Sequence, residues 1–159
     1  MADSAGPPPL VPFGLVLHHD GRWSHEGVPF RNKKLREAFD RGVVFLPEEG
    51  EEGKYVVALR HFRGEIIVEE AGFFVRDYDP PTGNLTLSDR SVEVLDVGSL
   101  RLSPIDGALL CAIKRELNPA GLAARFCRSA QSELLNAAEE GADGPRLRFG
   151  GGEHTLPDL

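Results

Sequence analysis

Residues 15–39, LVLHHDGRWSHEGVPFRNKKLREAF, decide how the first part of this chain folds. Asp20 and Gly21 lie between two short extended segments, and an Asp-Gly pair favours a type I′ turn, which needs positive φ at both central residues. We therefore predict a β-hairpin, with Trp23 on its second strand and Arg22 and Ser24 on the opposite face of that strand.

A helix is predicted directly after the hairpin. Asn32 is a suitable N-cap residue. Beyond it, Leu35, Ala38 and Phe39 recur at helical spacing, and Gly42 is expected to end the helix. The helix is short, and isolated helices of that length are marginal in water, so it is expected to pack on a sheet.

The charge balance limits the possible partners. The chain has 159 residues and a net charge of −7, whereas nucleic acids and anionic membranes need a basic footprint. We expect neither as a partner. The chain also carries a local basic patch, which consists of Arg31, Lys33, Lys34 and Arg36.

The predicted compartment is the cytoplasm. The two cysteines, Cys111 and Cys127, are scattered and fit a reducing environment better than a disulfide scaffold. The first residues do not combine a basic region with an apolar core, as a signal peptide would. No apolar stretch approaches the length of a membrane span.

The remaining pattern predicts an α+β fold, mainly antiparallel, with two short helices and two small similar halves. Residues 1–12 are expected to form a flexible Pro-rich arm. The breaker Pro80–Asn84 separates a first half, 13–79, from a second half, 85–159. The segments Tyr55–Arg60, Glu65–Glu69 and Phe73–Asp77 are expected to form one meander. Strand-end carboxylates at Glu69, Glu70, Asp77 and Asp79 are expected to face water.

The second half contains one ambiguous segment and one predicted helix. Residues 108–116 suit a helix by composition, but Ala108–Lys114 follows an alternating run across a turn, so a strand is preferred. Ser129 is the predicted N-cap of the second helix and Gly141 its stop. Both helices follow a turn glycine, a phenylalanine and an arginine, which hints at a duplication between residues 27–35 and 121–134.

Three motifs carry a family resemblance. The first is Asp20-Gly21-x-Trp23-x-His25-Glu26-Gly27-x-Pro29-Phe30-Arg31, followed by Leu35 and Phe39. The others are Ile67-Val68-Glu69-Glu70-Ala71-Gly72-Phe73 and Gly121-Leu122-Ala123-Ala124 with Arg128 and Leu134. Together they resemble a bacterial family of uncharacterised proteins, domain of unknown function 1285. The resemblance implies two similar α+β halves and a possible homodimer. It implies no activity, and a signalling or ligand-binding role has only been supposed for such proteins.

Four residues form the candidate ligand site: Trp23, His25, Glu26 and Arg31. They would line a groove between the hairpin and the helix, where Arg31 would take a carboxylate or phosphate with two parallel hydrogen bonds. The alternative is structural, with Gly27 supplying a positive φ and Glu26 capping the helix or pairing with Arg31.

No metal, cofactor or catalytic residue is predicted. His18 and His19 lie close to His25 and Glu26, but a zinc site needs three or four convergent ligands. The preferred function is a non-enzymatic module that binds a small anionic ligand or a protein partner in a regulatory or signalling role. Two alternatives stay open: an enzyme of unknown chemistry that uses His25 and Glu26, and a structural dimerisation module without a ligand site.

Overall fold

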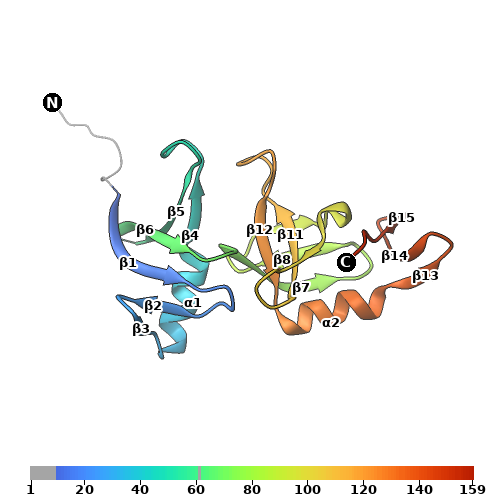
Figure 1. The fold of residues 1–159 in the computed structure, drawn as a ribbon, viewed down its shortest axis with the longest axis horizontal. Coiled ribbons are helices and arrows are strands. Elements are labelled where there is room, and N and C mark those ends of the chain that lie inside the picture. The colour runs from blue at the N-terminus through green and yellow to red at the C-terminus, as the bar shows by residue number, and fades with distance from the viewer. Residues whose placement is uncertain (1–9, 61) are drawn as a thin grey trace. The chain divides into compact units, whose positions relative to one another are not determined.

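The computed structural model describes residues 10–60 and 62–159 and divides the chain into two compact units, Met1–Glu69 and Glu70–Leu159 (Figure 1). Residues 1–9, most of the expected flexible arm, lie outside the described residues. The last two residues assigned to that arm are not part of it, because they begin strand β1 (Val11–Leu17). We describe each unit by itself.

The first unit is a six-stranded mixed sheet with one helix. Its strands pair in the order β3-β2-β1-β6-β5-β4, and β1 and β6 are parallel. Its remaining elements are β2 (Trp23–His25), β3 (Val28–Pro29), α1 (Lys33–Gly42), β4 (Val43–Leu46), β5 (Lys54–Leu59) and β6 (Phe62–Val68).

The predicted hairpin between β1 and β2 is present, but its turn differs from the expected one. Leu17 pairs with Trp23, His18 N–H donates to the Arg22 carbonyl at 2.8 Å, and Gly21 N–H donates to the His18 carbonyl at 2.9 Å. Among the residues of this turn, only Gly21 has a positive φ, at 89°. The connection is therefore a three-residue loop closed by a left-handed glycine, and the type I′ prediction is wrong.

Helix α1 begins as the sequence predicted. Asn32 lies in extended backbone, and its side chain accepts a hydrogen bond from Leu35 N–H at 3.0 Å, which satisfies one free donor of the first turn. Gly42 is the last helical residue and does not stop the helix by a positive φ. A Cβ at Gly42 would come within 2.9 Å of the Ala58 carbonyl oxygen, so glycine allows the helix end to approach β5.

The second unit contains another six-stranded mixed sheet and a small three-stranded one. The large sheet has the order β10-β11-β12-β7-β8-β9, and the small one β13-β14-β15. The elements are β7 (Phe73–Asp79), β8 (Asn84–Leu87), β9 (Val92–Val94), η1 (Val97–Ser99), β10 (Arg101–Leu102), β11 (Leu109–Ile113), β12 (Leu122–Phe126), α2 (Arg128–Ala137), β13 (Glu139–Gly141), β14 (Gly144–Phe149) and β15 (Gly152–Thr155).

The predicted α+β class with two similar halves is confirmed by the topology of the two large sheets. In each unit, two three-stranded meanders follow one another, and the first and last strands pair in parallel: β1 with β6, and β7 with β12. The helices occupy different places in this plan. Helix α1 lies between the meanders of the first unit, whereas α2 follows the last strand of the second. The expected match between residues 27–35 and 121–134 therefore does not reflect the repeat.

The division between the units falls at Glu69 and Glu70, not at Pro80–Asn84. Strand β7 pairs with β12 on one side and with β8 on the other, so it belongs to the second unit. The expected three-stranded meander is therefore wrong in its third member. Pro80–Asn84 is instead a tight connection within one hairpin, in which Gly83 N–H donates to the Asp79 carbonyl at 2.8 Å.

The ambiguous segment is strand β11, as preferred. The tail forms two strands, β14 and β15, which a glycine turn connects. Helix α2 begins earlier than predicted, because its N-cap is Cys127 and not Ser129, and it ends at Ala137. In the drawing α2 leads from β12 to β13 (Figure 1). Among the described residues, no helix is long and apolar enough to cross a membrane.

Candidate functional site

Trp23 fills the space between the hairpin and α1. Its side chain is 1% exposed, its ring lies 5.5 Å from that of Phe39, and its indole N–H donates to the Asp40 carboxylate at 2.8 Å. Phe30 also packs on Phe39, with ring centroids 5.2 Å apart. The four candidate site residues therefore do not share one open groove, since Trp23 is enclosed by the core.

His25, Glu26 and Arg31 are exposed around the β2–β3 turn and the segment that leads into α1. Glu26 and Gly27 form the turn with φ of 50° and 84°, so the positive φ expected at Gly27 is present. Glu26 N–H donates to the Gly14 carbonyl at 2.9 Å. Among the described residues no ion pair joins Glu26 to Arg31, and the α1 cap is Asn32, so Glu26 takes neither of the structural roles considered for it.

The basic patch lies at the amino end of α1. We call Arg31, Lys33, Lys34 and Arg36 the basic corner; the first three side chains are exposed, and Arg36 is half-buried. The first turn of α1 contains no acidic residue. The Lys33 ammonium lies 4.0 Å from the Glu37 carboxylate. Both side chains are largely exposed, so this ion pair is weak. The basic corner therefore presents positive charge beside a helix end that is itself positive.

A second polar cluster brings together His18, His19, Ser24 and Glu69. Glu69 accepts hydrogen bonds from the backbone N–H of His19, at 3.0 Å, and from its ring Nδ1. The ring of His18 lies 2.9 Å from the Ser24 hydroxyl and 3.6 Å from the Glu69 carboxylate. Sequence reasoning placed these histidines with His25 and missed Glu69, because the parallel pairing of β1 with β6 links residues about fifty positions apart.

The hydrogen bonds of this histidine cluster stabilise the charged form of the Glu69 carboxylate. The hydrogen bond from His19 N–H, and then that from its ring, hold the pKa of Glu69 below its usual value. Ser24 is only 6% exposed, so its hydroxyl is not open to a substrate. Among residues 10–60 and 62–159, no group of histidine, cysteine and carboxylate side chains is arranged to hold a metal ion.

The second unit holds a partly buried charged cluster that the sequence did not predict. Arg125 binds both oxygens of Asp106, at 3.0 and 2.7 Å. Glu70 accepts a hydrogen bond from the Ser103 hydroxyl at 2.7 Å, and its carboxylate lies 4.0 Å from Arg125. The Glu70 side chain is 9% exposed, so the expectation that it faces water is wrong. This cluster ties the start of the second unit to β12 and to the loop before β11.

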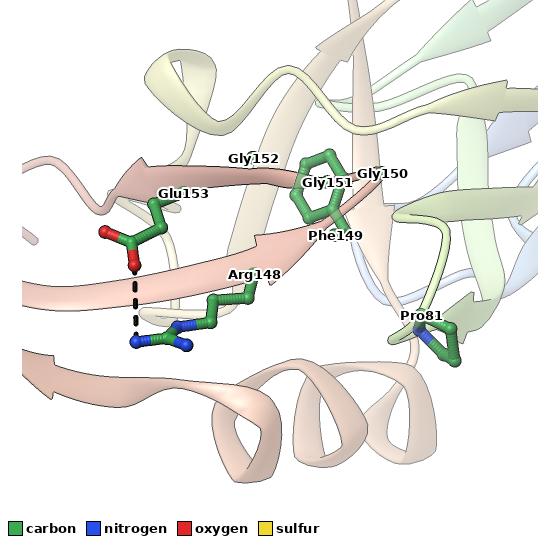
Figure 2. A pocket seen from close by; sticks show the side chains of 7 residues that line it. All are labelled: Pro81, Arg148, Phe149, Gly150, Gly151, Gly152 and Glu153. Carbon is green, nitrogen blue, oxygen red and sulfur yellow. Dashed lines mark ion pairs between the residues drawn. The ribbon is translucent and has the colours of Figure 1, made fainter.

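An open pocket of about 400 Å³ lies beside the β14–β15 turn (Figure 2). Its charged wall is the pair Arg148 and Glu153, 3.2 Å apart, and Arg148 also binds Glu139 at 3.1 Å. The ring of Phe149 is stacked on His154 at 4.1 Å and is 7% exposed. The charges in this pocket are paired with one another, so they give it no net preference for an anion.

The fold defines the class of protein: an α+β chain of two topologically similar units, each with a six-stranded mixed sheet closed by a parallel pair. Solved structures of DUF1285 family proteins share this fold. One, from Silicibacter pomeroyi DSS-3, is 19% identical, with a TM-score of 0.63 over 94% of this chain and 83% of that one. Another, from Shewanella baltica OS155, is 17% identical, with a TM-score of 0.51 over 79% of this chain and 92% of that one.

No protein-family model and no curated protein matches the chain significantly. The structural neighbours are the proteins to which the sequence motifs pointed, and the fold implied by that resemblance is confirmed. They carry no assigned activity in their names, so function rests on the chemistry of the site.

Proposed function

We propose that this protein is a non-enzymatic module that binds a small anionic ligand, through a carboxylate or phosphate group, at the basic corner of its first unit. The proposal rests on one observation. Arg31, Lys33 and Lys34 are exposed together at the amino end of α1, in a chain whose net charge is −7.

The lysines at the amino end of α1 are electrostatically unfavourable there, which supports a role for them in anion binding. The amino end of a helix carries partial positive charge and favours acidic residues, each worth about 0.3–1 kcal/mol there, so cations at this end disfavour the helix by a similar amount. The first turn of α1 holds Lys33 and Lys34 and no acidic residue. A bound anion would remove this repulsion and accept hydrogen bonds from the free backbone N–H groups of the first turn.

The roles of the four candidate residues differ. Arg31 is the main contact, because its planar guanidinium matches a carboxylate or phosphate. His25 is an exposed candidate contact, because its imidazole can donate a hydrogen bond to an anion. The Glu26 carboxylate would repel an anion, so we assign it to the β2–β3 turn. Trp23 supports the corner from the core and does not touch the ligand.

We assign a regulatory or signalling role, because binding at an exposed corner is reversible and leaves the ligand unchanged. The cytoplasm is the proposed compartment, since Cys111 and Cys127 are both free thiols. A partner protein that presents an acidic side chain or a phosphate is a second source of the same chemistry.

Thermal-shift assays with inorganic phosphate, pyrophosphate and citrate test the proposal. We expect at least one anion to raise the melting temperature of the wild type, and Arg31→Ala and Lys34→Ala to reduce that rise. Arg41→Ala is the matched control, because Arg41 is an exposed cation at the opposite end of the same helix. An equal loss in Arg41→Ala, or no effect of the corner variants on an observed rise, contradicts the proposal.

A further inference from the structure

The pocket beside the β14–β15 turn has two parts of different chemistry (Figure 2). Arg148 and Glu153 form the charged part, and their side chains reach toward each other from neighbouring strands. Pro81 and Phe149 form the apolar part. In Figure 2 Pro81 lies well apart from the charged pair, beyond the glycine turn at 150–152. A ligand that fills the pocket therefore meets an ion pair at one end and apolar surface at the other.

The walls of the pocket are held together by contacts within the second unit. Gly150 N–H donates to the Pro81 carbonyl at 3.2 Å, which joins the β14–β15 turn to the β7–β8 turn. The ring of Phe149 packs against Gly83 in that same turn, where a Cβ would come within 2.4 Å of the ring. Gly150 and Gly151 have positive φ, 58° and 79°, as the tight turn of a hairpin requires. The pocket is therefore formed before a ligand arrives, as is usual for small-molecule sites.

The ion pair in this pocket can open for a ligand. Arg148 and Glu153 are 55% and 52% exposed, and ion pairs between exposed side chains are weak, so their separation costs little. Arg148 also contacts Glu139 at 3.1 Å. A guanidinium has more N–H donors than these contacts use, and a carboxylate oxygen accepts more than one hydrogen bond. Both side chains can therefore bind a ligand without the loss of all their present partners.

The balance of charge around the pocket disfavours a ligand with one charge. Arg146 contacts Glu153 at 3.0 Å, so the cations Arg146 and Arg148 are matched by the anions Glu139 and Glu153. An anion at Arg148 would lie beside the Glu153 carboxylate, and a cation at Glu153 would lie beside the Arg148 guanidinium. A ligand that carries both charges avoids either repulsion.

We propose that this pocket binds a free α-amino acid with an apolar side chain. Its carboxylate accepts hydrogen bonds from Arg148, its ammonium donates to Glu153, and its side chain packs toward Pro81 and Phe149. Both charged groups of an α-amino acid are attached to one carbon atom, so they suit two protein charges that lie 3.2 Å apart.

The size of the pocket agrees with this ligand. Its volume of about 400 Å³ is near the lower end of the range for small-molecule sites, about 300–1,000 Å³. A longer peptide would carry its ammonium and carboxylate at distant ends and could not place both at the pair. All the lining residues belong to the second unit, so the proposal does not depend on the basic corner of the first.

Isothermal titration calorimetry with L-leucine and L-phenylalanine tests the proposal. We expect saturable binding of at least one of them. The N-acetyl derivative of the same amino acid lacks the ammonium, and the amide derivative lacks the carboxylate. Each is expected to bind about tenfold more weakly or worse, because one protein charge is left without its partner. Binding of neither amino acid, or equally strong binding of either derivative, overturns the proposal.

Arg148→Gln and Glu153→Gln test the two charged contacts, and each is expected to weaken binding by about tenfold or more. Both side chains are exposed, and circular dichroism checks that the variants fold. The matched control is Arg115→Gln, which removes a similarly exposed ion pair of the same unit, with Asp96 at 2.7 Å, outside the pocket lining. We expect the control to bind like the wild type.

Amide NMR of the wild type gives a readout that does not depend on any variant. Saturation with the bound amino acid is expected to shift the amide signals of residues 148–153 most. Pocket variants that bind like the wild type, or a control that loses binding equally, overturn the proposal. Shifts that are largest outside the pocket also overturn it, since the amino acid would then bind elsewhere.

Discussion

The indole N–H of Trp23, on β2, donates a hydrogen bond to the carboxylate of Asp40, on α1, at 2.8 Å. This bond joins the hairpin to the helix that carries the basic corner. Because Trp23 is buried, its N–H needs a partner, and Asp40 provides it from the part-buried side of the helix. The tryptophan in the sequence motif therefore fixes the position of α1 on its sheet.

Removal of this ring should destabilise the fold strongly. Trp23→Ala is expected to cost about 3–5 kcal/mol of unfolding free energy, because it leaves a cavity against Phe39. Asp40→Ala should cost about 1–3 kcal/mol, since it leaves the indole N–H buried without its acceptor. Urea denaturation measures both. Leu35→Ala is the control, because Leu35 is 42% exposed on the same helix; similar losses in all three variants would contradict the buried role of Trp23.

The ion pair of Asp89 and Lys114 should make the free energy of unfolding depend on pH in the acidic range. Burial alone would raise the pKa of Asp89, but hydrogen bonds from Ser91 and Lys114 outweigh it and hold that pKa below its usual value. A lowered pKa stabilises the fold above the unfolded pKa of about 3.9, and the effect is lost as pH falls through the folded pKa.

Asp89→Asn should therefore lower the unfolding free energy near pH 7 by about 1.5–3 kcal/mol, the usual value of hydrogen bonds to a charged group. The difference from the wild type should stay constant down to about pH 5 and shrink below about pH 4, as the wild-type carboxylate is protonated. Denaturation curves at a series of pH values measure this. A difference that persists unchanged in acid would show that the carboxylate charge is not its source.

Substitution by alanine should lower the free energy of unfolding by different amounts at Gly83 and Gly150. Both have positive φ, 74° and 58°, but a Cβ at Gly83 would overlap the ring of Phe149, while one at Gly150 meets nothing within 4 Å. Gly150→Ala is expected to cost about 1 kcal/mol for the backbone strain, and Gly83→Ala roughly 1–3 kcal/mol more for overpacking. Thermal or urea denaturation measures both; equal losses would contradict the close packing of the β14–β15 hairpin on the turn before β8.

The two cysteines should differ in reactivity. Burial raises the pKa of Cys111 to about 12, whereas Cys127 is partly exposed at the start of α2. A thiol reagent at neutral pH is expected to modify Cys127 in the folded protein and both cysteines only after unfolding. Peptide mapping by mass spectrometry identifies the modified residue, and rapid labelling of Cys111 in the folded state would contradict its burial.

Local sequence signals predicted most of the elements. Asn32 predicted the start of α1 because the cap is formed by a side chain three residues from its donor. Alternating apolar residues predicted the strands and the preferred state of β11. Turn glycines such as Gly27 predicted positive φ. Each of these signals depends on neighbours along the chain.

The unpredicted features depend on contacts between distant segments. The parallel pairing of β7 with β12 placed the unit boundary before Glu70, and no local breaker marks that position. The same kind of pairing, between β1 and β6, brought Glu69 to His19. The sequence motif grouped Trp23 with His25 and Arg31, but it did not show that the tryptophan is enclosed while the basic side chains stay exposed.

The central claim is that the basic corner binds an anion. An amide NMR titration of the wild type with pyrophosphate tests it most directly, with Arg31→Ala and Lys34→Ala as comparison variants and Arg41→Ala as the control. We predict saturable shifts concentrated at residues 31–36, weakened in the two corner variants and retained in the control. Shifts that are absent from residues 31–36, or that are largest elsewhere in the chain, would contradict the claim.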